Sequence, residues 1–130
     1  MARKLNPATW DHLLEKAQAE VAHILRALAP DLRNAATSVT LSYETSPSKA
    51  LIKEGIEQDT LGLFVGDAFA DAGQSSSPLP PQIILYLENL WDAAEQDEDT
   101  FCEEVRATYL HELGHFLGLD EDDLIDRGLE

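Results

Sequence analysis

Two histidines separated by three residues, His111 and His115, most constrain what this chain can fold into. If they lie on one α-helix, they stand about 6 Å apart along its axis and point in nearly the same direction. Local signals predict that helix, because Thr100 and Glu103 have the spacing of a capping box. Gly118 suits the left-handed residue that ends a helix. The pair is therefore expected on one face of a well-delimited helix.

The predicted helix, residues 101–117, carries a broad apolar arc that does not include the two histidines. At about 100° per residue, His111 and His115 share a separate stripe with Glu104 and Thr108. The residues on the apolar arc are Phe101, Cys102, Val105, Tyr109, Leu110, Leu113, Phe116 and Leu117. The two imidazoles are thus expected outside the core, where they are available to a ligand.

The chemistry of the segment His111-Glu-Leu-Gly-His115 indicates zinc. Two imidazole nitrogens one helical turn apart can converge on one ion at about 2.0–2.1 Å each. Glu112 projects at a neighbouring angle, within reach of a water on the metal but poorly placed to be a ligand. Zinc lowers the pKa of such a water to about 7. Glu112 could then take the water's proton as it attacks a carbonyl and pass it to a leaving amine.

A catalytic zinc site needs a third protein ligand and one open position. Gly118 lets the chain turn back toward the metal, and carboxylates follow at once. The candidate ligands after this turn are Asp120, Glu121, Asp122 and Asp123. A calcium loop is not expected there, because Ile125 stands where an EF-hand has its sixth-position glycine.

The run His111-Glu-Leu-Gly-His115-Phe-Leu-Gly118-Leu-Asp-Glu121 resembles the H-E-x-x-H-x-x-G-x-x-ligand layout of metzincins. It is most similar to a small bacterial family of minimal zincin-like metallopeptidases, formerly a domain of unknown function. That resemblance implies His111, His115 and Glu121 as zinc ligands and Glu112 as the catalytic base. The family usually has Asp where this chain has Glu121, so Asp120 and Asp122 remain alternatives. The resemblance covers roughly the C-terminal half of the chain, and only the zinc segment is specific.

Other zincin branches fit less well. Metzincins have a methionine-containing turn beneath the metal, and the one methionine here is Met1. Gluzincins supply a glutamate from a second helix well downstream of the zinc helix, and Glu130 is a weak candidate for that role.

The remaining pattern predicts an α+β fold in a single domain, residues 1–130. Spacings of three and four predict an N-terminal helix, and alternating or fully apolar runs predict three strands, the third more deeply buried. We expect a minimal zincin-like fold with a small mixed β-sheet of at least three strands, the zinc helix and a short C-terminal helix from about Glu121. The expected elements are a helix over 8–29, strands over 38–44, 61–66 and 83–87, a long loop over 67–81 and a solvated acidic connection over 92–99.

Charge and composition restrict the partners. Nine Lys and Arg stand against 25 Asp and Glu, giving a formal net charge of -16. Such a chain repels nucleic acid at long range and favours a basic or neutral ligand. A peptide or protein substrate is therefore expected, and a membrane partner is not. One cysteine, Cys102, and no visible signal peptide favour a cytoplasmic location.

Two functions from different classes, and a third without turnover, remain open. The first is a zinc peptidase whose substrate lies along an exposed strand edge, with Tyr86 or Tyr109 as lesser candidates to polarise the scissile carbonyl. The second is a zinc-dependent RNA endonuclease, because one small bacterial family has a similar histidine run. Glu112 and the negative charge favour the peptidase. The third is a zincin fold used for binding.

Three further side chains of metal-binding type are not expected to bind the metal. Cys102, as a fourth ligand, would make the zinc structural, but its place on the apolar arc favours core packing. His12 and His23 lie in the predicted N-terminal helix and are expected to face solvent.

Overall fold

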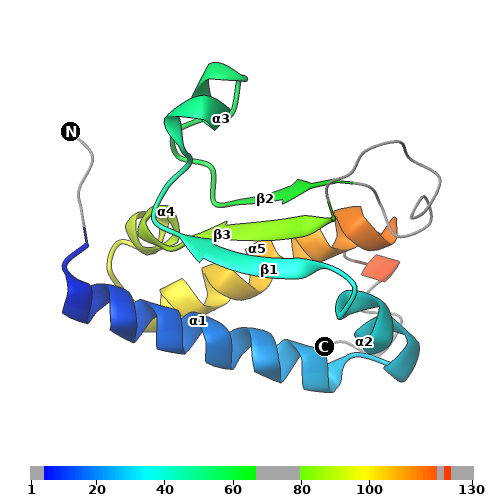
Figure 1. Ribbon diagram of the computed structural model, residues 1–130. Coiled ribbons are helices and arrows are strands. Elements are labelled where there is room, and N and C mark those ends of the chain that lie inside the picture. Colours follow the sequence, from blue (N-terminus) through cyan, green and yellow to red (C-terminus); the bar gives the residue numbers. More distant parts are fainter. Residues whose placement is uncertain (1–4, 67–79, 120–121, 124–130) are drawn as a thin grey trace.

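The computed structural model describes residues 5–66, 80–119 and 122–123. Within these ranges the chain forms five helices and three strands (Figure 1). In order they are α1 (Pro7–Ala27), α2 (Pro30–Ala36), β1 (Thr40–Glu44), α3 (Lys49–Lys53), β2 (Gly62–Val65), β3 (Gln82–Tyr86), α4 (Leu87–Ala93) and α5 (Glu98–Leu117).

The N-terminal helix is confirmed, and its boundaries have local causes. The Asn6 side chain accepts a hydrogen bond from the Thr9 N–H at 2.8 Å, which satisfies one of the free donors at the start of α1. Pro7 fits the first turn because proline has no N–H to lose there. The residues of α1 that face the core are Leu13, Ala17, Val21 and Ile24.

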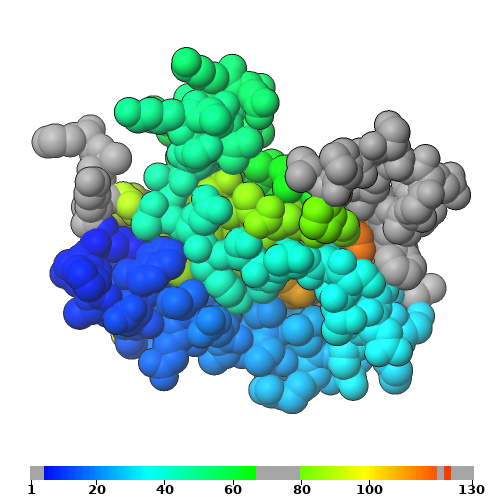
Figure 2. Space-filling view, in the orientation of Figure 1, coloured from blue at the N-terminus to red at the C-terminus, as the bar shows by residue number. Residues whose placement is uncertain are grey.

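Pro30 does more than end α1, which is a correction to the expected helix over 8–29. It occupies the first turn of α2, a short helix that the sequence did not predict. A proline that stops one helix also has the backbone angle that starts the next. The short α3 was likewise not predicted, and Figure 2 shows its segment projecting as a separate lobe from the rest of the molecule.

All three predicted strands are present and form one mixed sheet in the order β1-β3-β2. β1 is parallel to β3, and β2 is antiparallel to it. The central strand is the one whose sequence is apolar on both faces, and four of its five residues are buried. The expected α+β fold with a small mixed sheet is therefore confirmed, as is the deeper burial of the third strand.

β2 lies at one edge of the sheet, and its hydrogen-bond pattern fixes which main-chain groups point outward. Tyr86 N–H donates to the Leu61 carbonyl at 3.0 Å, so Leu61 faces the central strand. Main-chain groups alternate in direction along an antiparallel pair. The N–H and C=O of Leu63 therefore point toward β3, and those of Gly62 and Phe64 point toward the outer edge. In the part of the chain that the structure describes, no strand pairs with that edge.

The two long helices pack beside each other on one face of the sheet (Figure 1). Phe64 of β2 meets Phe116 of α5 with ring centroids 5.7 Å apart. The shared core joins buried residues of α1, α2, α4 and α5 to the central strand, with fully buried members including Leu13, Ile24, Ile83, Leu85, Phe101 and Leu113. This core fixes α5 beneath the edge strand β2.

The acidic connection expected over 92–99 is instead divided between two helices. α4 follows β3 directly and runs to Ala93, and α5 begins at Glu98. The predicted capping box is wrong, because Asp97 caps α5 and accepts from the Thr100 N–H at 2.9 Å. The predicted end is confirmed, since Gly118 adopts a left-handed conformation with φ of 73°.

Two sequence predictions fall largely outside the described residues. The long loop predicted over 67–81 is described only at residues 80 and 81, and the predicted C-terminal helix only at Asp122 and Asp123, which are helical. Within the described ranges, no helix is long and apolar enough to span a lipid bilayer.

Candidate metal centre

The structure brings His111, Glu112 and His115 together near the C-terminal end of α5. One nitrogen from each imidazole and one carboxylate oxygen of Glu112 all lie within 4.8 Å of one another. The Glu112 Oε1 atom is 3.5 Å from His115 Nδ1, and Oε2 is 4.0 Å from His111 Nε2. The two rings stand 4.4 Å apart at their centroids and are inclined by 62°. The predicted convergence of the two histidines is therefore present in the fold.

Burial divides this group into an inner carboxylate and two outer rings. The Glu112 side chain is 10% exposed, whereas those of His111 and His115 are 56% and 55% exposed. A carboxylate is costly to bury unless it has polar partners. Here two imidazoles lie within 4.0 Å of the carboxylate, so the buried acid sits behind an accessible pair of nitrogen donors.

The edge strand β2 explains the burial of Glu112. Residues four apart on a helix share a face, so Glu112 lies on the same side of α5 as Thr108 and Phe116. Thr108 adjoins Gly62, and Phe116 packs against Phe64. β2 therefore covers α5 one turn before and one turn after Glu112, while the histidines emerge beside the strand.

These donors fit a zinc ion. Zinc binds neutral imidazole nitrogen and carboxylate oxygen, usually in a four-coordinate site. Two nitrogens bound to one ion at about 2.0–2.1 Å lie no more than about 4.2 Å apart, so the observed spacing requires only small side-chain adjustments. The accessible rings leave an approach for the ion, for a third protein ligand and for water.

The third ligand predicted from sequence cannot be placed. Glu121 and its alternative Asp120 lie outside the described residues. Asp122 and Asp123 are described and are exposed. Glu121 therefore stays a prediction.

Cys102 is packed, as expected, against the core rather than beside the histidines. It is partly buried on α5 and contacts the hydrophobic cluster. Burial raises the pKa of its thiol, and the negative charge of Glu20 on α1 adds to that effect. A raised pKa disfavours the thiolate that a metal would bind.

The two tyrosines considered as carbonyl polarisers are both buried, which supports packing roles. Tyr109 is 2% exposed within the core, and Tyr86 is fully buried. Burial raises the pKa of Tyr109, and the nearby Tyr43 adds to the increase. Tyr86 alternates with Leu85, whose side chain faces α5, so Tyr86 points to the opposite side of the sheet from the histidines.

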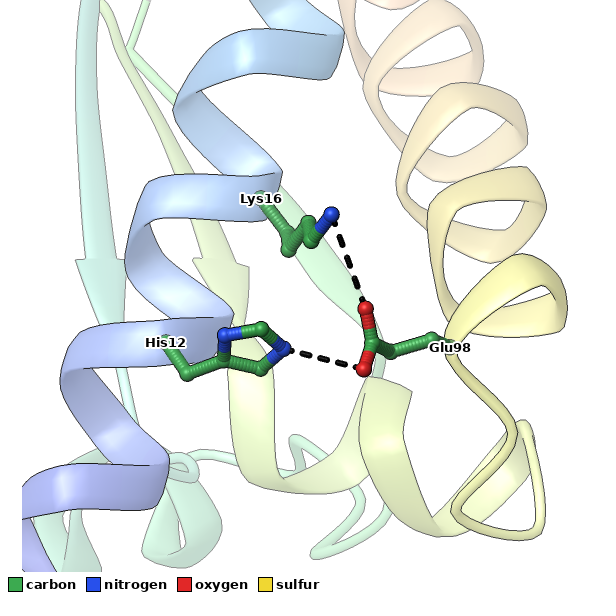
Figure 3. A network of polar contacts seen from close by, with 3 residues as sticks. All are labelled: His12, Lys16 and Glu98. Atoms are coloured by element: carbon green, nitrogen blue, oxygen red, sulfur yellow. Dashed lines mark ion pairs between the residues drawn. The ribbon is translucent and has the colours of Figure 1, made fainter.

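His12 and His23 are exposed, as the sequence predicted. The structure adds a contact that the sequence did not reveal: His12 Nε2 lies 3.1 Å from Glu98 Oε2 at the start of α5, and Lys16 Nζ lies 3.5 Å from Oε1 (Figure 3). The hydrogen bond from His12 is the main reason that the pKa of Glu98 is lowered. Only the packing of α1 against α5 could disclose this pairing, because its members are far apart in sequence.

A buried carboxylate behind two imidazoles on one helix, below a strand edge, is the arrangement expected of a zincin. A family model described as zincin-like metallopeptidase matches residues 36–129. The chain belongs to this family. The match to this family includes the whole sheet, α4 and α5, whereas α1 precedes it. No curated protein matches the chain significantly.

Proposed function

We propose that this member of the zincin-like metallopeptidase family is a zinc-dependent peptidase that acts on peptide or protein substrates. His111, His115 and Glu121 are the proposed zinc ligands, and Glu112 is the proposed general base. The observation that carries the proposal is the buried Glu112 carboxylate, which lies 3.5 Å from His115 and 4.0 Å from His111. A bound zinc ion would supply a Lewis acid and would lower the pKa of a coordinated water.

The chain's own residues would perform the remaining tasks. Glu112 would accept a proton from the water that attacks the scissile carbonyl and would later donate it to the departing amine. β2 would hold the substrate, because the outward main-chain groups of Gly62 and Phe64 can pair with an extended peptide. The strand covers α5 on both sides of Glu112 and would thereby limit the access of bulk water to this carboxylate.

The partners follow from charge. A net charge of -16 favours basic peptides and opposes RNA, so we propose no nucleic-acid substrate. We also propose a cytoplasmic protein without a membrane partner.

The decisive experiment compares Glu112→Gln with wild-type protein loaded with one zinc ion. Loss of the base should lower kcat on a fluorogenic peptide library by about 10²–10⁴-fold, the usual contribution of general acid–base catalysis. Zinc content, measured by elemental analysis, should stay unchanged. Glu103→Gln is the matched control, because Glu103 is an exposed carboxylate on the same helix. Full peptidase activity in Glu112→Gln, or cleavage of RNA but no peptide by the wild type, would contradict the proposal.

A further inference from the structure

Gly62 of β2 lies against Thr108, which is on the histidine-bearing stripe of α5. A Cβ atom at position 62 would lie 2.5 Å from Thr108 Cγ2, 3.3 Å from the Ile84 carbonyl oxygen and 3.3 Å from Leu85 Cδ2. Carbon atoms normally pack about 3.5–4.0 Å apart. A side chain at position 62 therefore has contacts on three sides, the closest of them with α5.

Backbone conformation does not explain this glycine. The described glycines with positive φ are Gly55, Gly66 and Gly118, and Gly62 is not among them. Alanine could therefore adopt the strand conformation at position 62 without backbone strain. The remaining reason for glycine is the close approach of the strand to the helix.

The helix side of this contact is also restricted. Thr108 is β-branched, and such side chains have few allowed χ1 rotamers in a helix. Thr108 lies one turn before Glu112, on the same stripe of α5 as His111 and His115. The Gly62–Thr108 contact thus joins the strand edge to the face of α5 that carries the candidate metal centre.

We infer that Gly62 and Thr108 are positioning residues that set the distance between the substrate-binding edge of β2 and the metal centre. The inference rests on the proposed peptidase function. The main-chain groups of Gly62 point outward along the strand edge. The Gly62–Thr108 contact would therefore set the distance between α5 and a peptide paired with these groups. A larger residue at position 62 would lift the strand, and the scissile carbonyl with it, away from the zinc ligands and Glu112.

The two histidine ligands would not move, because both belong to α5. Peptide use and zinc binding should therefore respond differently to substitution at position 62. Substitution at position 62 should impair the use of peptide while zinc binding stays as in the wild type.

The test is a set of variants at the two positions. In zinc-loaded protein, Gly62→Ala should lower kcat/KM on a cleavable peptide by about 10- to 100-fold, the scale of an ångström-sized misplacement. Zinc content and zinc affinity should remain those of the wild type. Removing the Thr108 branch in Gly62→Ala/Thr108→Ala should restore kcat/KM to the level of Thr108→Ala alone. Gly62→Ala/Thr108→Val keeps the branch and should stay impaired.

A second measurement distinguishes this inference from the proposed function. Peptide affinity is measured by calorimetry on zinc-loaded Glu112→Gln, with and without Gly62→Ala, and Tm is recorded for each protein. Unchanged affinity after Gly62→Ala, equal rescue by alanine and valine at position 108, or lost zinc binding would overturn the inference alone. A wild-type protein that neither binds nor cleaves any peptide would overturn the proposed function and this inference together.

Discussion

The two ends of α5 each place a glutamate beside histidine, and they differ in whether that glutamate is buried. At the N-terminal end, Glu98 is half exposed and meets His12 and Lys16 from another helix. At the C-terminal end, Glu112 is 10% exposed and meets His111 and His115 from its own helix. The first group is a surface ion pair between helices, and the second is a buried acid behind two open nitrogen donors.

This difference shows why a histidine near a carboxylate is not by itself a site. Lys16 supplies Glu98 with a permanent positive charge, so the surface group is already paired. Glu112 instead has two imidazoles within 4.0 Å, and a neutral imidazole has a lone pair that a metal ion can use. Burial of the acid and exposure of the bases together favour a metal centre at only one end of the helix.

The largest expected difference between the two ends concerns metal content. His115→Ala removes one of two imidazole donors and should reduce bound zinc from about one ion per chain to near zero, because a zinc site requires its full ligand set. His12→Ala should retain zinc at the wild-type level. Elemental analysis after dialysis measures both. Equal zinc content in the two variants would remove the distinction drawn between the ends of α5.

A smaller effect is expected for a buried polar group in the sheet, the Tyr86 hydroxyl. It has no hydrogen-bond partner among the residues that the structure describes. Tyr86→Phe removes an unsatisfied buried group, and should leave the free energy of unfolding unchanged or raise it by about 1 kcal/mol. Chemical denaturation measures this change. Peptidase activity should not alter, and its loss would show that the hydroxyl acts at the metal centre after all.

The smallest expected effect belongs to the surface ion pair. The pKa of Glu98 is lowered from its usual value of 4.5, mainly by the hydrogen bond from His12. The stabilisation is therefore present above the unfolded-state pKa and is lost as pH falls through the lower folded-state pKa. Glu98→Gln should slightly weaken the dependence of Tm on pH below about pH 4.5 and leave zinc content unchanged. A steeper acid dependence in the variant would contradict this sign.

The comparison also shows what sequence could predict. The spacing of His111 and His115 placed both rings on one stripe, because helical geometry is local and periodic. Alternating or fully apolar runs predict the three strands but not the order β1-β3-β2, since pairing joins residues far apart in the chain. The contact between His12 and Glu98 was missed for the same reason.

The incorrect predictions arose where two local signals competed. Thr100 has the spacing of a helix cap, yet Asp97 accepts the hydrogen bond from the Thr100 N–H and starts the helix earlier. The helix expected over 8–29 ends just before Pro30, whose backbone angle also suits the start of a second helix. The burial of Glu112 could not be derived from its own helix, because the strand that covers it comes from residues 62–65.

The placement of both histidines within a single turn of α5 bears on the order of folding. Helical turns form in less than a microsecond, whereas the pairing of distant strands is much slower. The two nitrogen donors would thus be aligned as soon as this turn winds, before the sheet assembles. Zinc bound by this pair would then favour the wound helix over the uncoiled chain.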